Sequence, residues 1–507
     1  MKKSVGDFMK KKYLKTLSAL TVICLLITCS GCNFTTTTVT SEIRSTVTYV
    51  DGDGSVVSAP ESQDSESSGG QNTSGIISNI QDNTVNNAGE IDPSKEEKLS
   101  GSFELQIFVG GYGSEAWEYA IAKFEELNPE LEVNAHLDTN VNAQMKTRWA
   151  KDNPPDFVFI EGTNMPAEVW MEEGKLLDLS DLYENGKVYG TDTLIKEQLK
   201  NGLVSYYKNT DKIYQMPVLL STYGMWYDEA FLNSKGWSVP KNYTQLKSFC
   251  ATSKKAGVTP LIYPGNYSGY LVWGLLMPAV ASEAVASNDL DFFYDVANAA
   301  NESVFADKRF RRCLEKISEL AKAGYFDQNA LSMNHITSQA SWLAHNAVLI
   351  PNGLWLENEM KNSIPDGFRM RYYPAMLQDE GDPACIIASS AMVGVAAKGK
   401  NTEAAKAFIS FLYTDDVARK FAELCAVPSA TRVDVSGAEL TEAAKQVNEM
   451  INSSDVRLVA KGSTTWGSVD ATINEVVNSI VSQNPDKNIS VDEAIDKLQK
   501  ATKKKNG

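Results

Sequence analysis

A tryptophan follows a turn-forming tripeptide in the C-terminal half of the chain. Ala347–Ile350 is apolar, Pro351-Asn352-Gly353 is expected to form a tight turn, and Trp355 opens a predicted helix. A flat apolar ring beside an amide such as Asn352 suits a sugar, whose C–H face stacks on the ring while its hydroxyls form hydrogen bonds. The alternative is that Trp355 packs in the core, because most tryptophans are largely buried.

Other residue patterns that could indicate catalysis, nucleotide binding or metal binding do not support such a site. Glu357 and Glu359 suggest the carboxylate pair of a glycoside hydrolase, but residues two apart on a helix diverge by about 200° and cannot flank one bond. The loop Gly110–Gly113 lacks both the GxGxxG spacing and a Gly-Lys-Ser/Thr ending, which excludes a nucleotide loop. With three histidines and no HExxH motif, no metal site is expected, and no cofactor is predicted.

Charge and the N-terminus indicate an exported protein. The formal net charge is −16, which argues against nucleic acid as a partner and against electrostatic binding to anionic lipid. Lysines from Lys10 to Lys15 precede a short apolar run, Leu17–Ile27, which is too short for a comfortable membrane span. Cys29-Ser30-Gly31-Cys32 resembles the lipobox of bacterial lipoproteins, although Cys29 replaces the usual leucine. An ordinary signal peptide is the alternative.

The lipobox resemblance implies a signal peptide over residues 1–31 and a lipid on Cys32. It places the protein at the cell membrane on the extracytoplasmic face, held by the lipid alone. Residues 32–100 are polar and poor in aromatics, so we expect a disordered tether. Four cysteines lie beyond it without a CxxC pair, and their spacing allows either disulfides or buried free thiols. They are Cys250, Cys313, Cys385 and Cys425.

The folded part begins with alternating strand and helix patterns. Helical patterns including Trp117–Leu127 and Met145–Trp149 separate the strands, and this βαβ order predicts a parallel sheet. The expected strands are Leu105–Val109, Leu131–Leu137 and Phe157–Ile160. Ligands bind at the carboxyl ends of such strands, which here carry Gly110–Tyr112 and Glu161–Asn164.

Later segments resemble the extracellular solute-binding proteins of sugar-importing ABC transporters. Asp211–Val218 is similar to that family's G-K-x-Y-x-x-P run, with Asp211 in place of Gly, and Tyr227–Glu229 is similar to its Y-N-K. Ala391–Val395 followed by Ala404–Phe408 resembles its return strand and A-A-K-x-F helix. The resemblance extends from about residue 103 to the end. Pro351–Met360 narrows it toward the N-acetylglucosamine and diacetylchitobiose branch.

The resemblance implies an α/β, two-lobed periplasmic-binding-protein fold, hinged and maltose-binding-protein-like, in which each lobe is a mixed sheet flanked by helices. Residues 101–220 with 389–430 would form lobe 1, and residues 221–388 with 431–507 would form lobe 2. The lobes would be joined by crossings near Leu219–Thr222, Ile387–Ser390 and Pro428–Val433.

Carried over by position, the family's sugar contacts fall on aromatics and on polar loop residues. The aromatic candidates are Trp355, Trp466, Tyr270, Tyr223, Tyr112 and Trp273. The polar and backbone candidates are Glu161, Gly162, Thr163, Ser221, Thr222 and Asn352. For each aromatic, core packing is the alternative.

The implied function is non-enzymatic. The protein would be a monomer that captures a small carbohydrate, such as N-acetylglucosamine or chitobiose, between its lobes and delivers it to the permease subunits of an ABC importer. Two other classes remain open: a glycan-acting enzyme, and a surface adhesin or scaffold built on the same fold.

Overall fold

The computed structural model describes residues 84–160, 167–207, 210–374, 376–462 and 466–506. The predicted signal peptide, Cys32 and most of the predicted tether lie outside these residues, so the lipid anchor stays a prediction. Glu161, Gly162 and Thr163 also lie outside them.

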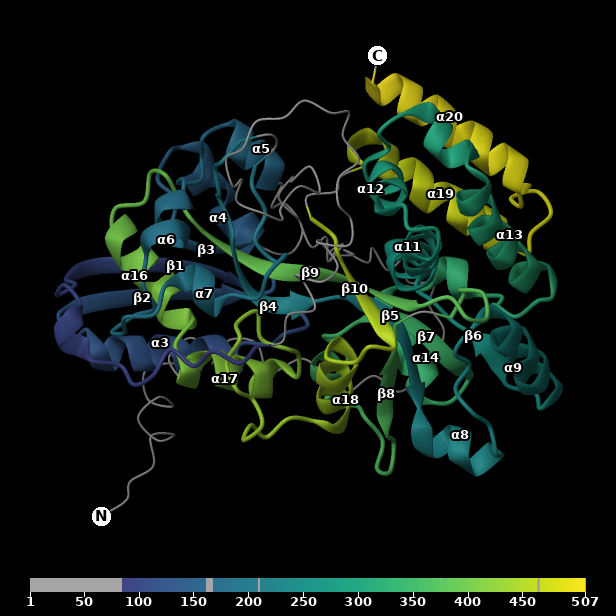
Figure 1. Ribbon diagram of the computed structural model, residues 1–507, viewed down its shortest axis with the longest axis horizontal. Coiled ribbons are helices and arrows are strands. Elements are labelled where there is room, and N and C mark those ends of the chain that lie inside the picture. The colour runs from purple at the N-terminus through teal and green to yellow at the C-terminus, as the bar shows by residue number, and fades with distance from the viewer. Residues whose placement is uncertain (1–83, 161–166, 208–209, 375, 463–465, 507) are drawn as a thin grey trace, which may run out of the picture. The chain divides into compact units, whose positions relative to one another are not determined.

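A six-stranded sheet organises the first lobe (Figure 1). Its strand β1 (Gly101–Phe108) lies between β2 (Leu131–Asp138) and β3 (Phe157–Ile160) and runs parallel to both. Helix α3 (Glu115–Leu127) connects β1 to β2, and α4 (Val141–Ala150) connects β2 to β3. The predicted βαβ succession is therefore confirmed. The apolar face of α3 is buried, and its members are Ala116, Trp117, Ala120, Ile121 and Phe124.

The long strand β9 (Ala384–Val395) joins the two lobes. Its C-terminal half pairs antiparallel with β3 and with β4 (Met216–Ser221), while its N-terminal half pairs parallel with β10 (Val456–Ala460). All 12 of its residues are buried. The crossing predicted near Ile387–Ser390 falls in the middle of this strand.

A four-stranded mixed sheet organises the second lobe. Its order is β6 (Thr259–Leu261), β7 (Ala347–Gly353), β5 (Tyr223–Asp228) and β8 (Met370–Tyr373). Strand β7 runs parallel to β6 and antiparallel to β5. A single residue, Thr222, separates β4 of one sheet from β5 of the other, so the chain changes sheet where the first crossing is predicted.

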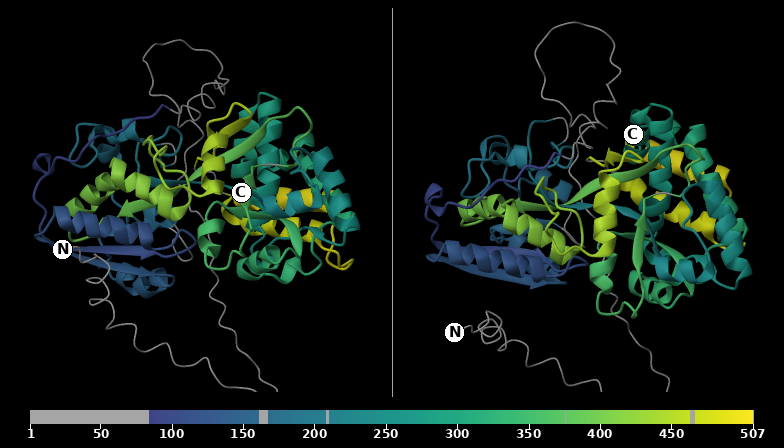
Figure 2. Two further views of the ribbon diagram at one scale, coloured as in Figure 1. Left: turned by 90° about the horizontal axis from the view of Figure 1, so that it is seen from below. Right: turned by 60° about the horizontal axis from the view of Figure 1, so that its bottom comes forward.

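Helices surround the second sheet, and Figure 2 shows this helical half beside the half that holds the N-terminal strands. One of them, α13 (Lys308–Lys322), is amphipathic and buries its apolar stripe. Its neighbours include α11 (Met277–Ala286), α12 (Leu290–Asn298), α19 (Asp470–Val481) and α20 (Val491–Asn506).

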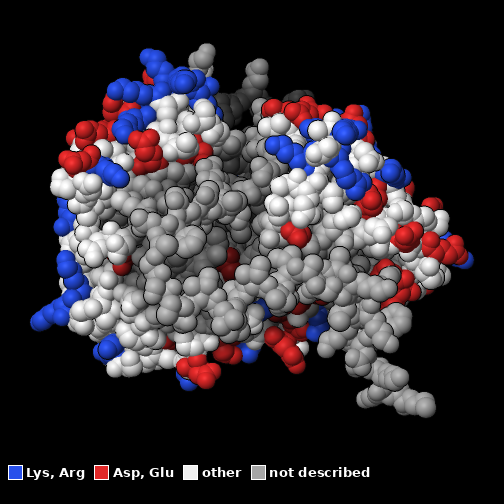
Figure 3. Space-filling model, turned by 180° about the vertical axis from the view of Figure 1, so that it is seen from behind, with Lys and Arg blue, Asp and Glu red and all other residues white. Residues whose placement is uncertain are grey.

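Charged side chains of both signs are interspersed on the face seen in Figure 3. Many form exposed pairs, such as Lys398 with Asp152 at 2.8 Å. Pairs of this kind contribute about 0.2–1 kcal/mol each, so they are not what holds the helices in place.

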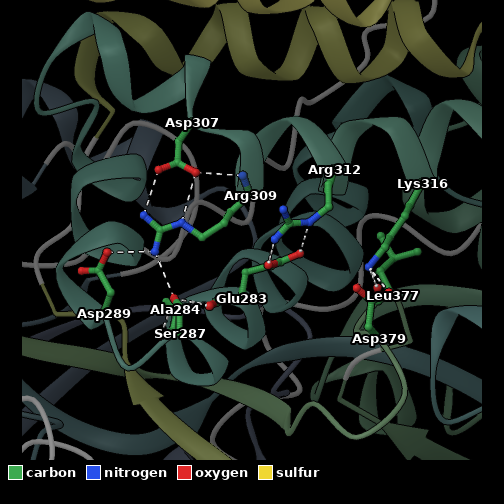
Figure 4. Close-up of polar contacts among 10 residues, drawn as sticks. All are labelled: Glu283, Ala284, Ser287, Asp289, Asp307, Arg309, Arg312, Lys316, Leu377 and Asp379. Atoms are coloured by element: carbon green, nitrogen blue, oxygen red, sulfur yellow. Dashed lines mark hydrogen bonds and ion pairs between the residues drawn. The ribbon is translucent and has the colours of Figure 1, made fainter.

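A less exposed network ties α13 to its neighbours (Figure 4). Arg309 forms two bonds to the Asp307 carboxylate, with Nη2–Oδ2 at 2.8 Å, and its Nη1 lies 2.8 Å from Asp289 Oδ2. On the following turns Arg312 pairs with Glu283 on α11, and Lys316 lies 2.8 Å from Asp379. These bonds fix the start of α13 against α11 and the α11–α12 turn.

Among the residues that the structure describes, one helical stretch is long and apolar enough to cross a membrane. It covers Gly269–Ala286, and 78% of it is buried inside the protein. Its second half is α11, which packs against β9. Burial against a central strand identifies it as a core helix.

Residues 84–100 correct the predicted tether. The N–H groups of Ala88 and Gly89 donate to the two carboxylate oxygens of Asp415, at 2.9 and 3.1 Å. Asn86 N–H donates to Arg432 C=O at 3.0 Å, beside the third predicted crossing. Composition alone predicts that this stretch is solvated. In the structure its backbone N–H groups instead donate to the Asp415 carboxylate and to backbone carbonyls. We call residues 84–96 the N-terminal strap.

The strap continues as far as a turn in the first lobe. Gly190 accepts from Asp92 N–H at 2.9 Å, and its own N–H donates to Glu96 Oε1 at 2.6 Å. Gly190 has φ +68°, and a Cβ there would lie 2.6 Å from Ile91. The strap therefore packs directly on Gly190. A larger residue at this position would displace the strap.

The four cysteines of the folded part are buried and form no disulfide with one another. Burial raises the pKa of the Cys250 and Cys313 thiols to about 12. Of the two alternatives left open by the sequence, the structure has thiols, and those of Cys250 and Cys313 are protonated at neutral pH. Within the described ranges no group of His, Cys, Asp or Glu side chains is arranged to hold a metal ion.

Candidate functional site

The segment around Trp355 is a strand, a short turn and a helix, but the turn begins later than predicted. Strand β7 continues through Pro351-Asn352-Gly353, where Asn352 pairs with Gly224 and Gly353 with Tyr223. The chain turns at Leu354–Trp355, and α15 (Leu356–Met360) follows. The tripeptide was misread because pairing with β5 outweighs its local turn preference.

Four of the predicted aromatics meet at this turn. The Trp355 ring centroid lies 5.0 Å from that of Tyr223, 5.9 Å from Tyr112 and 6.2 Å from Tyr270, each edge-on. They come from the turn after β7, the start of β5, the loop after β1 and the short helix α10 (Gly269–Leu271). We call these four residues the aromatic cluster. It joins a loop of the first lobe to three segments of the second.

Two glycine backbones hold the Trp355 ring. A Cβ built on Gly111 would lie 2.5 Å from Trp355 Cδ1, and one on Gly353 would lie 2.2 Å from Trp355 Cη2. Neither position could carry a side chain without moving the indole. Trp355 is 4% exposed, which agrees with the core-packing alternative, and its contact with a ligand stays a prediction.

Trp466 and Trp273 form a second group. Their ring centroids lie 5.0 Å apart at 32°, and the Lys461 ammonium lies 3.9 Å above the Trp273 ring. Trp466 is buried, and its indole N–H donates to Val296 C=O at 2.8 Å. Trp466 therefore supports Trp273 from behind.

A pocket lies beside both groups. It has room for about one water molecule and is lined by Tyr223, Trp273, Ile387, Ser389 and Lys461. Tyr223 belongs to the aromatic cluster and also lines the pocket, and Ile387 and Ser389 lie on the joining strand β9. The pocket therefore lies where the two lobes meet.

The sequence analysis missed three of these lining residues as site candidates. Ile387 and Ser389 were placed in a crossing without a ligand role. Lys461 was not noticed, because a lysine at the end of a strand is typical of solvated surface. Its backbone N–H donates to Ala388 C=O at 2.7 Å, which continues the β10–β9 pairing and turns its side chain toward the pocket.

The predicted polar residues have fixed partners. Tyr112 donates its O–H to Ser221 Oγ at 2.9 Å, which links the loop after β1 to the end of β4. Ser389 donates to Ser221 C=O at 2.8 Å. Thr222 is buried and its hydroxyl lies 3.3 Å from Tyr223 C=O. Ser221 and Thr222 thus position the aromatic cluster.

Asn352 differs from expectation in a specific way. Its side chain is fully buried, and Oδ1 accepts from Gly353 N–H at 2.8 Å. Among the described residues its Nδ2 has no hydrogen-bond partner, although an unmade buried bond costs about 1–3 kcal/mol. Asn352 therefore holds the end of β7, and its amide keeps an unused donor.

Contacts outside the pocket also join the lobes. Asn358 Nδ2 donates to Gly111 C=O at 2.9 Å, and Lys361 pairs with Glu115. Partial burial alone would raise the pKa of Glu115, but the bonds from Lys361 and from backbone N–H groups outweigh it, so the pKa lies below its usual value. Helix α15 thus closes onto the start of α3.

The carboxylate pair considered for hydrolysis is split, as helix geometry predicts. Glu357 accepts from the Thr441 hydroxyl at 2.6 Å, whereas Glu359 accepts from Gln339 Nε2 at 2.6 Å. Burial raises the pKa of both carboxyls. Each belongs to a separate helix contact, and the two do not face a common substrate.

Comparisons with known proteins agree with this architecture. The family model described as bacterial extracellular solute-binding protein matches residues 110–419. The chain is 22% identical to a multiple sugar-binding protein of Streptococcus mutans over 68% of its own length and 78% of the relative's. It is also 22% identical to the diacetylchitobiose-binding protein NgcE of Streptomyces coelicolor, over 66% of this chain and 70% of that one.

Solved structures show the same fold. The apo form of RafE from Streptococcus pneumoniae superposes with a TM-score of 0.62 at 17% identity, covering 80% of this chain and 98% of RafE. The two-lobed α/β architecture is thus the periplasmic-binding-protein fold that the sequence predicts. Because the family model covers more than half of its residues, the chain belongs to the bacterial extracellular solute-binding proteins.

Proposed function

We propose that this protein is the sugar-binding component of an ABC importer, which captures a carbohydrate between its lobes and presents it to the permease subunits. The observation that supports this most is the aromatic cluster, which draws Tyr112 from the first lobe and Trp355, Tyr223 and Tyr270 from the second. Aromatic faces beside hydroxyl and amide groups bind the apolar faces and the hydroxyls of a sugar ring.

Hinge closure is the proposed mechanism. Strand β9 and the β4–β5 junction connect the lobes, and a ligand that contacts both lobes stabilises the closed arrangement. The contact from Asn358 to the loop after β1 and the contact from Lys361 to the start of α3 would form on closure and break on opening. The permease would then recognise the closed form. No chemical step is part of this proposal.

The finer proposal concerns the ligand and the anchor. An N-acetylglucosamine or chitobiose ligand is supported by the likeness to the diacetylchitobiose-binding protein NgcE and by the Pro351–Met360 sequence. A lipid on Cys32 would keep the protein at the extracytoplasmic face of the cell membrane. The polar residues 33–83 would then separate the binding domain from the membrane.

Thermal unfolding of the purified protein with a panel of sugars tests the proposal. A ligand at 100 times its dissociation constant should add about 2.7 kcal/mol of stability, a clear shift of the midpoint. The panel includes N-acetylglucosamine, chitobiose, maltose, raffinose and xylose oligomers. A shift with maltose or xylose oligomers alone would discard the chitobiose ligand. The absence of a shift with every sugar would overturn the sugar-binding function and favour an adhesin or scaffold.

A further inference from the structure

A buried amide that contacts α15 has an oxygen without a hydrogen-bond donor. Gln339 lies on α14 (His335–Leu343) and is fully buried, and its Nε2 donates to Glu359 Oε2 on α15 at 2.6 Å. Among the described residues its Oε1 has no partner. Buried amide oxygens nearly always accept a hydrogen bond, so this atom needs a donor.

Glu359 supplies that donor if it is protonated. A carboxyl and a carboxamide are planar groups that each present two polar atoms side by side. A neutral Glu359 can accept from Gln339 Nε2 with one oxygen and donate its O–H to Gln339 Oε1 from the other, which satisfies both groups. An ionised carboxylate only accepts, so it leaves Gln339 Oε1 without a donor.

Both orientations of the Gln339 amide favour a proton on Glu359. In the orientation described, the proton satisfies Gln339 Oε1. If the amide oxygen and nitrogen were exchanged, two oxygens would lie 2.6 Å apart, and a contact that short between oxygens needs a hydrogen between them. Exchange of the two atoms therefore leaves the need for the proton unchanged.

The surroundings of Glu359 also favour the neutral carboxyl. Burial raises its pKa, the bond from Gln339 lowers it by less, and no charged neighbour among the described residues contributes. One turn earlier on α14, burial lowers the pKa of His335, so this imidazole is neutral at neutral pH. On the side of α15, Glu357 accepts from a threonine hydroxyl and Lys361 pairs with a carboxylate of α3. Neither of them is a counter-ion for Glu359.

The pair lies next to the residues that close the proposed site. The backbone N–H of Glu359 donates to Trp355 C=O at 2.8 Å, and the preceding residue, Asn358, donates from its side chain to Gly111 C=O of the first lobe at 2.9 Å. Helix α15 has only five residues, so a shift at Glu359 moves both. The bonding of Glu359 to α14 therefore helps to hold Trp355 and Asn358 in the closed arrangement.

We propose that Glu359 is a neutral acid in the closed protein, that its two-bond pair with Gln339 positions α15, and that sugar binding weakens when this proton is lost. This inference rests on the proposed sugar-binding function and adds control by protons to it. A carboxyl whose folded pKa is raised keeps its proton at acidic pH and loses it as pH rises through the folded value. One hydrogen bond is then lost, so sugar affinity should fall about two- to tenfold between pH 5 and pH 8.

Calorimetric titration at several pH values from 5 to 8 tests it, with chitobiose or whichever sugar of the panel shifts the midpoint most. Glu359→Gln imitates the neutral acid, because its N–H can donate to Gln339 Oε1 while its C=O accepts. Gln339→Met removes both bonds. Glu302→Gln is the control, because Glu302 is an exposed carboxylate of the same lobe and its loss changes the net charge by the same amount.

The affinity of wild type and of Glu302→Gln should fall about two- to tenfold from pH 5 to pH 8. Glu359→Gln should keep the affinity of pH 5 throughout, and Gln339→Met should bind weakly at every pH. An equal fall in Glu359→Gln and wild type would overturn the inference. A wild-type affinity that does not change with pH would also overturn it, and is the result expected if an ordered water donates to Gln339. If Glu359→Gln does not fold, Gln339→Met decides by losing or keeping the pH dependence.

Unfolding without sugar separates this inference from the proposed function. Because Glu359→Gln has no proton to lose at this position, its unfolding midpoint should rise relative to that of wild type between pH 5 and pH 8. Binding of no sugar at any pH would overturn the proposed function, while the relative rise would still show the proton on Glu359. A constant difference between the two midpoints would overturn the inference even if sugars bind.

Discussion

Trp355 is the side chain on which the proposed site depends most. Its ring is held by Gly111 and Gly353 and touched edge-on by three tyrosines. Replacing it by Ala should weaken sugar binding by about 1–3 kcal/mol, the usual scale for an aromatic anchor. It should also lower the unfolding midpoint, because removing a buried Trp costs several kcal/mol. Trp355→Phe keeps an apolar ring and separates the two effects.

A second buried tryptophan supplies the control. Trp342 is 1% exposed, donates to Val348 C=O at 3.1 Å and lies outside the pocket lining. Trp342→Phe should lower the midpoint and leave the dissociation constant unchanged. If Trp355→Phe and Trp342→Phe behave alike in titration calorimetry, Trp355 is a core residue and the cluster has no ligand role.

Gly111 gives an independent prediction at the same scale. In Gly111→Ala the new methyl would lie within 2.5 Å of the Trp355 indole, so the ring must move and sugar affinity should fall about tenfold. Gly437→Ala is the control, because a Cβ there meets nothing within 4 Å. Equal dissociation constants for the two variants would show that the position of Trp355 does not matter to the ligand.

The family resemblance proposes Trp355, Tyr223 and Tyr270, with Tyr112, as ligand contacts; the structure brings their rings together, and their contact with a ligand stays a prediction. Residue types and order in the chain were not enough for Lys461. A lysine after a strand has no local signature that separates a pocket from a surface. Only its pairing beside Ala388, a residue 73 positions earlier in the numbering, turns it inward.

Among the elements, the N-terminal strap departs most from what composition predicts. Asp415 accepts two consecutive N–H groups of the strap, and bonds to charged acceptors contribute about 1.5–3 kcal/mol each at most. Asp415→Asn should therefore lower the unfolding midpoint by a few degrees, since each kcal/mol is worth about 1 °C in a folded part of roughly 400 residues. Differential scanning calorimetry measures it.

Glu403→Gln is the control for the strap, because Glu403 is also in the first turn of a helix, α16 (Thr402–Leu412), but is exposed and pairs only with Lys406 among the contacts described. Hydrogen exchange at Ala88 and Gly89 should rise in Asp415→Asn alone. Unaltered exchange and midpoint would mean that the strap is not held by Asp415.

Helix α13 gives a pH prediction. The hydrogen bonds from Arg309 hold the pKa of Asp307 below its usual range. A carboxyl whose folded pKa is depressed stabilises the protein above its unfolded pKa of about 3.9 and loses that contribution as pH falls through the lower folded value. Between pH 5 and 3, wild-type protein should therefore lose more stability than Arg309→Met.

Arg311→Met is the control for this prediction, since Arg311 is two residues away and pairs with the exposed Asp492. Its stability should fall with pH as in wild type. Urea unfolding at several pH values measures the free energy of unfolding of each protein. If this free energy falls equally with pH in Arg309→Met and in wild type, Asp307 does not cause the pH dependence.

Element patterns were predictable where they are local. Alternating strand and helix patterns predicted the βαβ unit, and the helical pattern over Trp117–Leu127 predicted α3, whose apolar face is buried. The predicted end of β7, before Pro351, was wrong. Pro351 and Gly353 favour a turn locally, but both residues still pair with β5. The dual pairing of β9 is also non-local: one strand serves β3 and β4 at one end and β10 at the other.

At the scale of the folded molecule, closure is the property to be explained. The lobes meet through the aromatic cluster and through Asn358 and Lys361, which contact the loop after β1 and the start of α3. Because the latter two contacts lie outside the pocket lining, they can stabilise the closed form without touching the ligand. They therefore determine the free energy of closing the free protein. The less favourable that free energy is, the weaker the observed ligand binding.

Asn358→Ala should shift the free protein toward the open form and weaken sugar binding about two- to tenfold, the worth of one neutral hydrogen bond. Lys361→Met should have a smaller effect, because an exposed ion pair contributes about 0.2–1 kcal/mol. Both should act on dissociation rate more than on association, since the encounter occurs in the open form. Small-angle scattering of the free protein and stopped-flow binding measure the two consequences.

Lys398→Met is the matched control, because its pair with Asp152 lies within the first lobe and cannot report on closure. A looser free protein with unchanged sugar affinity would separate these contacts from ligand capture. A tighter affinity in Asn358→Ala would reverse their role, because the contact to Gly111 would then hold Trp355 in the place that the sugar needs. In that case Trp355 would occupy the ligand's place in the free protein. The ligand would have to displace Trp355 before the lobes could close on it.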